Sequence, residues 1–391
     1  PPRSTLFPYT TLFRSERFSE GAWTYLIFIP VLYAVFTYFR KRIGAPTPEM
    51  DYLGHINSNL LAGFGFGQSI GGNPEAENGD QTPPRLVWRP DPILSNHRLK
   101  KEISIHHLLT ILDGSDYAAQ AVPMTQFISE TLGSQVTLLS ASRDFEDDLE
   151  RRAAINNYLC ETAGKIHAAG IQVTCQVKAG TPAQVTNDLV SQQKVDLVVV
   201  TTRGSSGEKN WLSEGLSSKL VHLLDIPVLL VQVYESGPPE APHIGRILVT
   251  LDGSVFSEQI LPYARLFGHA FNCELMLICV PAVPESQKYR APASVINTIR
   301  RQAETSMKKY VKNVAERLRE EGLTVSTVVT GSYPARTIVD VGKREGVDLI
   351  MLTSQGRGGL DLLFMGSVAQ QVVQLTDSPV FILPINRELE N

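Results

Sequence analysis

The feature of this sequence that most constrains its fold is an internal repeat in its C-terminal two thirds. The run LLTIL leads into Asp113-Gly114-Ser115, and the run ILVTL leads into Asp252-Gly253-Ser254, 139 residues later. Further along, Val195-Asp196-Leu197-Val198 matches Val347-Asp348-Leu349-Ile350 at a separation of 152. Self-similarity of this kind indicates two copies of one structural unit. The second copy is 13 residues longer, and we expect the extra residues near Pro281 to Ala293, between a strand and a helix.

Each copy predicts strands that alternate with helices. The predicted strands are short and rich in Val, Ile and Leu, as in parallel strands that are buried on both faces. Pro182 and Pro334 fit the first turn of a helix, and a longer helix is predicted over Thr298–Glu321, ending at Gly322. We therefore predict an α/β fold with two tandem, doubly wound, Rossmann-like domains, each with a five-stranded parallel sheet, at residues 105–233 and 244–386. In the second copy the predicted strands are Ile247–Leu251, Glu274–Val280, Leu323–Thr330, Val347–Thr353 and Val380–Leu383.

The first fifteen residues, PPRSTLFPYTTLFRS, resemble the translation of a sequencing-library adapter at every position. The alternative is an unusual natural N-terminus or targeting peptide. A segment of this kind is excluded from fold reasoning. We expect residues 1–15 to be an artefact, the gene to continue upstream and the chain to be a C-terminal fragment.

An uncharged stretch of nineteen residues, Gly21 to Phe39, follows. As a helix it is about 28 Å long, close to the thickness of a bilayer core. Trp23 and Tyr38 lie near its two ends, and Arg40-Lys41-Arg42 follow directly. Because basic residues remain on the cytoplasmic side, we expect a transmembrane helix within 16–44, in contact with lipid of the inner or plasma membrane, and the rest of the chain in the cytoplasm. A signal peptide or a buried soluble helix is the alternative.

The stretch FSEGAWTYLIFIPVLYAVFTYFRKR, Phe18 to Arg42, is similar to the end of permeases of the amino-acid/polyamine/organocation type. In those carriers a Phe-x-Glu-Gly-Ala-Trp run precedes the last helix. The resemblance implies that the remainder of a permease is missing upstream. Residues 45–104, rich in Gly, Pro and Asn, are predicted to be a flexible linker, including the glycine-rich Gly63–Gly72, whose glycines are out of spacing for a phosphate loop.

The unusual residues of the second copy follow the predicted strands. Asp252-Gly253-Ser254 ends the first strand, and Thr353 ends the fourth and leads into a glycine-rich loop. Gly366-Ser367 then opens the last helix. Ligands of doubly wound sheets bind at the carboxyl ends of the strands. Free amides at a helix N-terminus bind phosphate, and glycines allow an anion to approach the backbone.

Both copies resemble universal stress protein domains of the UspA type, over His107–Val233 and Arg246–Pro384. Nucleotide-binding members of that family carry Gly-x2-Gly-x9-Gly-Ser/Thr after the fourth strand. The second copy has this pattern from Thr353, with Thr in place of the first glycine; the Thr353 side chain either crowds the phosphate loop or donates a hydroxyl. The resemblance implies ATP, with Mg²⁺ as an accompanying ion, adenine near Asp252, Val280 and Leu352, and phosphates on the amides of Gly356, Gly366, Ser367 and Val368.

The first copy matches this pattern less well. Thr201 again replaces the first glycine, and an ungapped alignment from Pro227 places Glu214 where the second copy has Gly366. A carboxylate there would repel phosphate. We expect the first copy to bind no ATP and to serve as the partner of the second in a pseudo-dimer. The resemblance implies that the two copies then pack through the last strand of each, Val228–Val231 and Val380–Leu383.

Charge and composition narrow the classes of function. The net charge of −4, from 36 basic and 40 acidic residues, gives no basic excess for nucleic acid. The four cysteines have no metal-ligand spacing, and no catalytic arrangement can be placed on the strand ends, so we expect no enzyme. The sequence predicts a nucleotide-sensing regulatory module of a membrane permease. The alternatives are a membrane-anchored tandem stress protein that acts through ATP and protein partners, and a slow ATP hydrolase. Homo-oligomerisation stays open.

Overall fold

The structure is a computed structural model. It describes residues 102–202, 215–235, 237, 241–281, 293–331, 333–354 and 366–385. The adapter-like start, the apolar stretch Gly21–Phe39 and residues 45–101 of the predicted linker lie outside these residues. Within the part of the chain that is described, no helix combines the length and the apolar character needed to cross a membrane.

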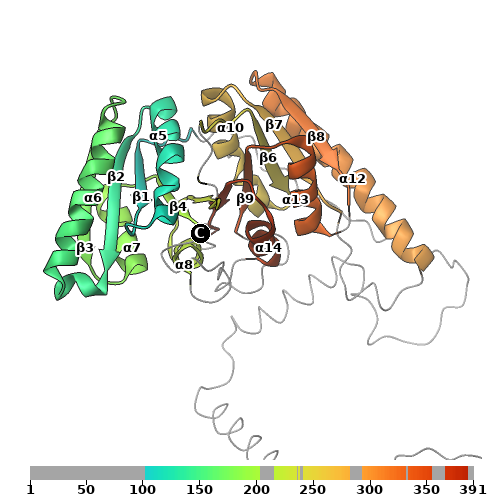
Figure 1. The fold of residues 1–391 in the computed structure, drawn as a ribbon. Helices are drawn as coiled ribbons and strands as arrows, with labels where there is room; N and C mark the ends of the chain where they lie inside the picture. The colour runs from blue at the N-terminus through green and yellow to red at the C-terminus, as the bar shows by residue number, and fades with distance from the viewer. Residues whose placement is uncertain are drawn as a thin grey trace, which may run out of the picture. The chain divides into compact units, whose positions relative to one another are not determined.

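The first copy, drawn in cyan to yellow-green in Figure 1, has the predicted alternation of strands and helices. Ser115 caps the first helix, since its side chain accepts a hydrogen bond from the Ala118 amide at 3.1 Å. The elements are β1 (His107–Ile111), α4 (Asp116–Ala119), α5 (Ala121–Leu132), β2 (Gln135–Ser142), the 3-10 helix η3 (Arg143–Glu146), α6 (Leu149–His167), β3 (Val173–Ala179), α7 (Pro182–Gln193), β4 (Leu197–Thr201), α8 (Leu216–Leu223) and β5 (Val228–Val231).

The second copy, drawn in yellow to red, follows the same order. Ser254 caps its first helix as Ser115 does in the first copy. The elements are β6 (Arg246–Leu251), α9 (Val255–Glu258), α10 (Leu261–Ala270), β7 (Glu274–Cys279), α12 (Ala293–Glu320), β8 (Val325–Val329), α13 (Pro334–Glu345), β9 (Leu349–Thr353), α14 (Ser367–Leu375) and β10 (Val380–Leu383).

All ten strands form one sheet in the order β3-β2-β1-β4-β5-β10-β9-β6-β7-β8. The strands of each copy run parallel, which confirms the predicted α/β fold with a mostly parallel sheet. The two five-stranded sheets are not separate, because β5 and β10 pair antiparallel, with Val380 opposite Leu230 and Ile382 opposite Val228. The last strand of each copy therefore lies at the centre of the sheet.

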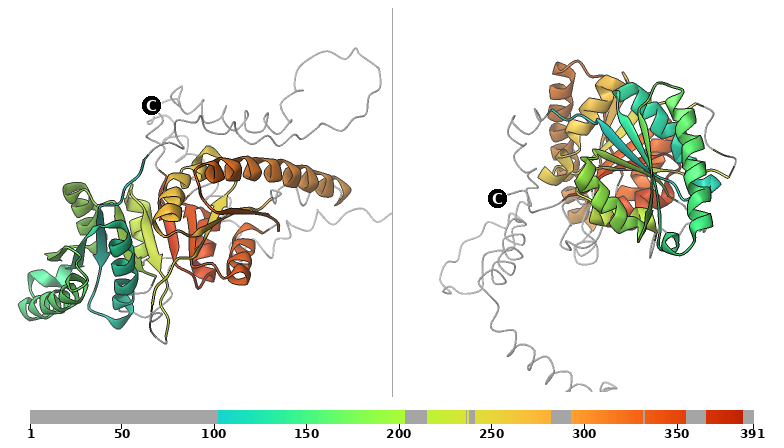
Figure 2. Two further views of the ribbon diagram at one scale, coloured as in Figure 1. Left: turned by 90° about the horizontal axis from the view of Figure 1, so that it is seen from above. Right: turned by 90° about the vertical axis from the view of Figure 1, so that its left-hand side faces the viewer.

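Helices cover both faces of the sheet, as the views in Figure 2 show. One core cluster includes buried residues of α5, α6, α10 and α12, and a second includes residues of α7, α8, α13 and α14. Each cluster contains residues of both copies. Strands such as β1, β4 and β9 are buried along their whole length because apolar helices pack on both of their faces.

Several predicted boundaries differ from the structure. Strand β8 is three residues shorter than predicted, and α12 begins at Ala293 rather than Thr298. Because α12 has 28 residues and α6 has 19, part of the second copy's extra length extends this helix rather than the connection before it. Residues 282–292, where the insertion was expected, lie outside the described part of the chain.

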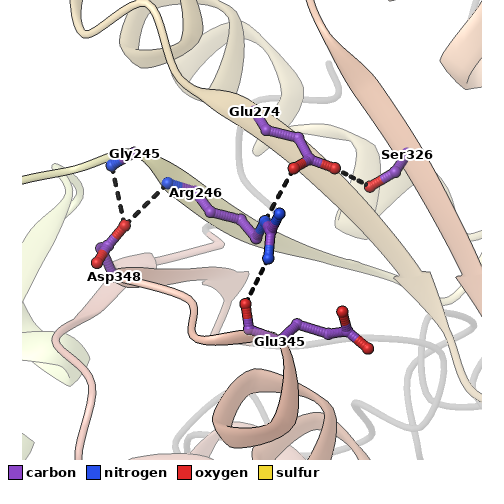
Figure 3. Close-up of polar contacts among 6 residues, drawn as sticks. All are labelled: Gly245, Arg246, Glu274, Ser326, Glu345 and Asp348. Atoms are coloured by element: carbon purple, nitrogen blue, oxygen red, sulfur yellow. Dashed lines mark hydrogen bonds and ion pairs between the residues drawn. The ribbon is translucent and has the colours of Figure 1, made fainter.

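The repeated Asp of the Val-Asp-Leu motif fastens the start of each first strand. Asp348 Oδ2 accepts hydrogen bonds from the amides of Gly245 and Arg246, both at 2.9 Å (Figure 3). Asp196 does the same in the first copy, with the amides of His106 at 2.8 Å and His107 at 3.0 Å. The motif that reveals the repeat in the sequence therefore has a structural role in both copies.

Arg246 ties together three elements beside Asp348 (Figure 3). Its Nε donates to Glu274 Oε2 at 2.8 Å, and its Nη1 donates to the Glu345 carbonyl oxygen at 2.5 Å. Ser326 Oγ donates to the other oxygen of Glu274 at 2.5 Å. The Ser326 hydrogen bond and the Arg246 guanidinium lower the pKa of Glu274, although burial opposes them. This cluster joins the starts of β6, β7 and β8 to the end of α13.

Candidate functional site

Strands β6 and β9 separate at their carboxyl ends. Their ladder runs from Ile247 opposite Leu349 to Val249 opposite Met351, while both strands continue for two more residues. From β6 the chain crosses over to β7 and then to β8 on one side of β6. It then returns to β9 on the other side of β6, so the direction in which strands are added to the sheet reverses between β6 and β9. This is the topological switch point, where doubly wound sheets open a crevice for a ligand. In the first copy β1 and β4 have the corresponding positions.

Asp252 lies directly after β6 at this edge, where it organises a turn. Its Oδ1 accepts hydrogen bonds from the Ser254 amide at 2.9 Å and from Ser254 Oγ at 2.6 Å. Ser254 Oγ in turn accepts from the Ser257 amide at 3.2 Å and caps α9, while Gly253 takes a φ of 76°. Asp113 forms the same turn in the first copy but is exposed, whereas Asp252 is half-buried. The sequence prediction placed Asp252 correctly at the strand end, and the structure adds its role in the turn.

The end of β9 is held by Ser354, a residue that the sequence reasoning did not select. The Ser354 amide donates to the Leu383 carbonyl oxygen at 2.8 Å, and its Oγ accepts from the Ile385 amide at 3.0 Å. The preceding residue, Thr353, is also buried, with 8% of its surface exposed. These two hydrogen bonds fix the end of β9 to the end of β10. The remainder of the glycine-rich loop, including Gly356, lies outside the described residues.

The amide of Gly366, which was predicted to contact phosphate, has a hydrogen-bond partner within the chain. Its amide donates to the Ser354 carbonyl oxygen at 2.7 Å and is therefore engaged by the chain itself. This bond holds together the two ends of the loop between residues 354 and 366. Gly366 is the N-cap residue of α14, with φ −57° and ψ 143°.

The first turn of α14 keeps amides that have no partner within the helix. The first intrahelical bond runs from the Gln370 amide to the Gly366 carbonyl oxygen at 3.1 Å, so the amides of Ser367, Val368 and Ala369 precede it. The side chains of Ser367 and Val368 are exposed. This end of the helix carries partial positive charge and can accept an anion.

The N-terminus of α8 corrects the comparison of the two copies. Gly215 caps α8 with φ −62° and ψ 141°, nearly the conformation of Gly366. The ungapped alignment placed Glu214 at the position of Gly366, but by conformation Gly215 is the counterpart, because α8 is one residue shorter than α14. Glu214 lies outside the described residues, as does Gly204. A remaining difference is that α14 begins with Ser367 and α8 with Leu216.

Val280 and Leu352, predicted to lie near adenine, are both almost fully buried, with 8% and 3% of their surfaces exposed. Both belong to the core cluster beneath α13 and α14. Val280 follows β7 directly, and Leu251 at the end of β6 lies opposite Cys279. Asp252 and Val280 therefore both follow paired strand ends, whereas Leu352 lies within β9.

A buried tyrosine beneath the Asp252 turn was also missed by sequence reasoning. Tyr310 of α12 is 2% exposed, and burial raises its pKa, with the nearby Glu258, Cys279 and Asp252 adding to the rise. Tyr158 of α6 is its counterpart, 152 residues earlier; burial raises the pKa of Tyr158, and the nearby Asp113 adds to the rise. The spacing of the repeat was the signal that could have identified this pair. Among the described residues, no group of His, Cys, Asp and Glu could hold a metal ion.

Comparison with known proteins identifies both copies. The sequence profile of the universal stress protein family matches residues 104–232 and 243–384, more than half of the chain. The Bacillus subtilis universal stress protein YxiE is 31% identical over 144 residues, which cover 35% of this chain and 97% of that protein. Universal stress protein Rv2005c of Mycobacterium tuberculosis is 27% identical over 212 residues, 54% of this chain and 69% of the relative.

Solved structures show the same fold. A universal stress protein from Archaeoglobus fulgidus matches with a TM-score of 0.56 and 18% identity, over 73% of this chain and 99% of that one. A functionally unknown protein, PA1789 from Pseudomonas aeruginosa, matches with a TM-score of 0.52 and 16% identity, over 74% of this chain and 95% of that one. The two α/β copies, their parallel strands and the match of the family profile to each lead to one conclusion: this chain carries tandem universal stress protein domains and belongs to the universal stress protein family.

Proposed function

We propose that the second copy binds ATP at the edge where β6 and β9 separate, and that the tandem domains use this binding to regulate a membrane permease. The observation that carries the ATP site is the combination of that separation with the first turn of α14. The amides of Ser367, Val368 and Ala369 have no acceptor within the helix. They fit the phosphates of a nucleotide, and Ser367 adds a hydroxyl donor.

Asp252 suits the opposite end of the same ligand. A carboxylate accepts hydrogen bonds, and the exocyclic amine of adenine and the ribose hydroxyls are donors. Its Oδ1 is already engaged by Ser254, which fixes the orientation of the carboxylate. Buried Val280 and Leu352 supply the apolar floor. Gly366 acts by closing the loop, rather than by donating its amide to phosphate.

Isothermal titration calorimetry of the full chain with ATP, with and without Mg²⁺, tests the site. The variant Gly366→Asp keeps a residue favoured at a helix N-cap while it adds a negative charge beside the phosphates. We expect it to weaken binding by at least tenfold. Gly215→Asp makes the same change at the N-cap of α8 and is the matched control, expected to leave the affinity within twofold.

Each outcome of the titration has a defined reading. No heat from the unmodified chain at millimolar ATP would contradict ATP binding. Equal affinity in Gly366→Asp and the unmodified chain would contradict the α14 site. A loss confined to Gly215→Asp would move the site to the first copy.

The permease part of the proposal rests on the sequence alone. Its support is the apolar Gly21–Phe39, the basic Arg40-Lys41-Arg42 and the resemblance of Phe18–Arg42 to the end of an amino-acid-type carrier. Regulation further requires that ATP bind two states of the carrier with different affinity. Sequencing the source DNA upstream of the Glu16 codon tests the attachment. An open frame that encodes further hydrophobic segments is expected, and a nearby start codon would contradict it.

A further inference from the structure

Two thiols of the first copy meet where α6 packs on β3. Cys160 belongs to α6 and is exposed, and Cys175 belongs to β3 and is half-buried. The Cys175 thiol donates a hydrogen bond to the Leu159 carbonyl oxygen at 3.4 Å. That carbonyl belongs to the peptide that leads into Cys160. The sulfur of Cys175 therefore lies against the turn of α6 that carries Cys160.

The surroundings hold both side chains at this place. Strand β3 is the edge strand on the first copy's side of the sheet, and α6 packs on it. Cys175 packs against the core together with Val173 and Val177, and Asn156 Nδ2 donates to Cys160 Sγ at 3.9 Å. Burial raises the pKa of Cys175, and interaction with the Cys160 thiol adds to the rise. The two thiols are thus direct neighbours, one reachable from solvent and one sheltered.

The fold itself does not require this pair. At the spacing of 152 residues, the second copy has Lys312 in place of Cys160 and Thr327 in place of Cys175. The second copy packs its corresponding helix α12 on β8 without them. Its own cysteines, Cys273 and Cys279, are buried at other positions. The neighbouring thiols are therefore a property of the first copy alone.

We propose that Cys160 and Cys175 are a redox modification site, at which a peroxide converts the two neighbouring thiols into a disulfide between α6 and β3. The exposed Cys160 thiolate attacks the peroxide, an S–O bond forms, the O–O bond breaks and water is released after proton transfer. The Cys175 sulfur then attacks the sulfur of the Cys160 sulfenic acid. The S–S bond forms, the S–O bond breaks, and hydroxide leaves with the thiol proton as water. Two thiols are oxidised by two electrons, and one hydrogen peroxide is reduced to two waters.

The disulfide acts on the copy that carries the Asp113 turn. Helix α6 packs Ile155 directly beneath Gly114 of that turn, so closely that a Cβ added to Gly114 would lie 2.6 Å from Ile155 Cδ1. A bond that closes the chain between residues 160 and 175 restricts the unfolded state and lowers the unfolding constant of this copy on the order of a hundred-fold. Oxidation therefore fixes α6 against the sheet beneath the turn.

Peptide mapping of the full chain tests the site directly. The reduced chain is treated with a small excess of hydrogen peroxide, the free thiols are blocked with N-ethylmaleimide, and the chain is digested with trypsin. Cleavage after Arg152, Lys165 and Lys178 places Cys160 and Cys175 in different peptides, 153–165 and 166–178. We expect these peptides to be joined, about 2 Da lighter than their sum, and separated again by dithiothreitol.

Single variants and the buried thiols complete the design. Cys160→Ser and Cys175→Ser should each abolish the joined peptide, and each should remove the rise in thermal midpoint that oxidation gives the unmodified chain. Cys273 and Cys279 share one tryptic peptide and provide an internal control, since burial should keep both reduced. The proposal is overturned if oxidation yields Cys160 sulfinic acid without a joined peptide. It is equally overturned if the product is a disulfide between two chains through Cys160.

Discussion

Removal of the Asp348 carboxylate should loosen the start of β6 and leave the first copy unchanged. The carboxylate is mostly buried, with 21% of its side chain exposed, and it accepts two backbone amides at 2.9 Å each. A hydrogen bond to a charged group contributes about 1.5–3 kcal/mol. The Gly245 amide lies at an exposed position and can bind water in the variant, whereas the Arg246 amide is partly buried. We therefore count the hydrogen bond of the Arg246 amide fully and that of the Gly245 amide in part, so Asp348→Ala should lose about 3 kcal/mol of local stability.

Hydrogen exchange followed by mass spectrometry measures this change locally. A loss of about 3 kcal/mol should accelerate exchange in the peptide 243–251 by about 100-fold, while the peptide 104–111 keeps its protection. Asp196→Ala is the matched variant and should reverse the pattern, because Asp196 fastens β1 in the same way. Asp348→Asn retains one acceptor oxygen and should lose about half as much. Protection of 243–251 within threefold of the unmodified chain in Asp348→Ala would refute the reasoning.

Three further perturbations address the helix ends, the charge cluster and the core. Lys194 ends α7 with a φ of 50°, where the second copy has Gly346 with a φ of 60°. Lys194→Gly should relieve about 1–2 kcal/mol of backbone strain, and the greater freedom of its unfolded chain should cost about 0.4–1 kcal/mol. The variant should therefore be more stable by about 1 kcal/mol in urea unfolding. An unchanged or lower urea midpoint would contradict this. Because the pKa of Glu274 is lowered in the folded chain, its contribution to stability is present above the ordinary pKa of 4.5 and is lost as pH falls through the folded pKa. Glu274→Gln should therefore have a lower urea midpoint than the unmodified chain at pH 7, and the difference between the two midpoints should narrow toward pH 3. A difference that stays constant with pH would contradict this. Phe267 is fully buried between Phe271, at a centroid distance of 5.2 Å, and Phe381, at 5.5 Å, so Phe267→Ala should cost about 3–5 kcal/mol of unfolding free energy; a cost below about 1 kcal/mol would show that the site collapses.

Local patterns in the sequence were enough to predict the two copies and their alternating strands and helices. Runs of Val, Ile and Leu identify strands buried on both faces, and proline and glycine mark helix starts and ends through their backbone preferences. The predictions of Val380–Leu383 as a strand and of Pro182 and Pro334 in first turns are confirmed. The predicted start of α12 was wrong by five residues, because the helix continues toward the N-terminus over Ala293–Asn297, a stretch that contains no proline or glycine to mark a start.

The candidate site was predictable only in outline. Asp252 and the N-terminus of α14 follow from strand and helix signals that are local in sequence. Ser354 and Tyr310 belong to no motif that the sequence reveals. Their roles depend on which backbone groups and side chains the fold brings near them. The counterpart of Gly366 was misplaced as Glu214 because an alignment counts residues, whereas the helix start is fixed by the backbone conformation of Gly215.

By itself, the sequence determined the architecture of each copy, since the periodicity of apolar residues and the turn residues act within a few positions of one another. The resemblance implied that the copies pack through their last strands, but only the tertiary structure decided the direction and register of that pairing. The antiparallel pairing of β5 with β10 joins them into one sheet, and Gln120 of the first copy holds the backbone of Tyr234, whose hydroxyl reaches the Asp377 carbonyl oxygen of the second. The meeting of Cys160 and Cys175 is of the same kind. Contacts between residues distant in sequence depend on packing of the whole chain, and no local pattern encodes them.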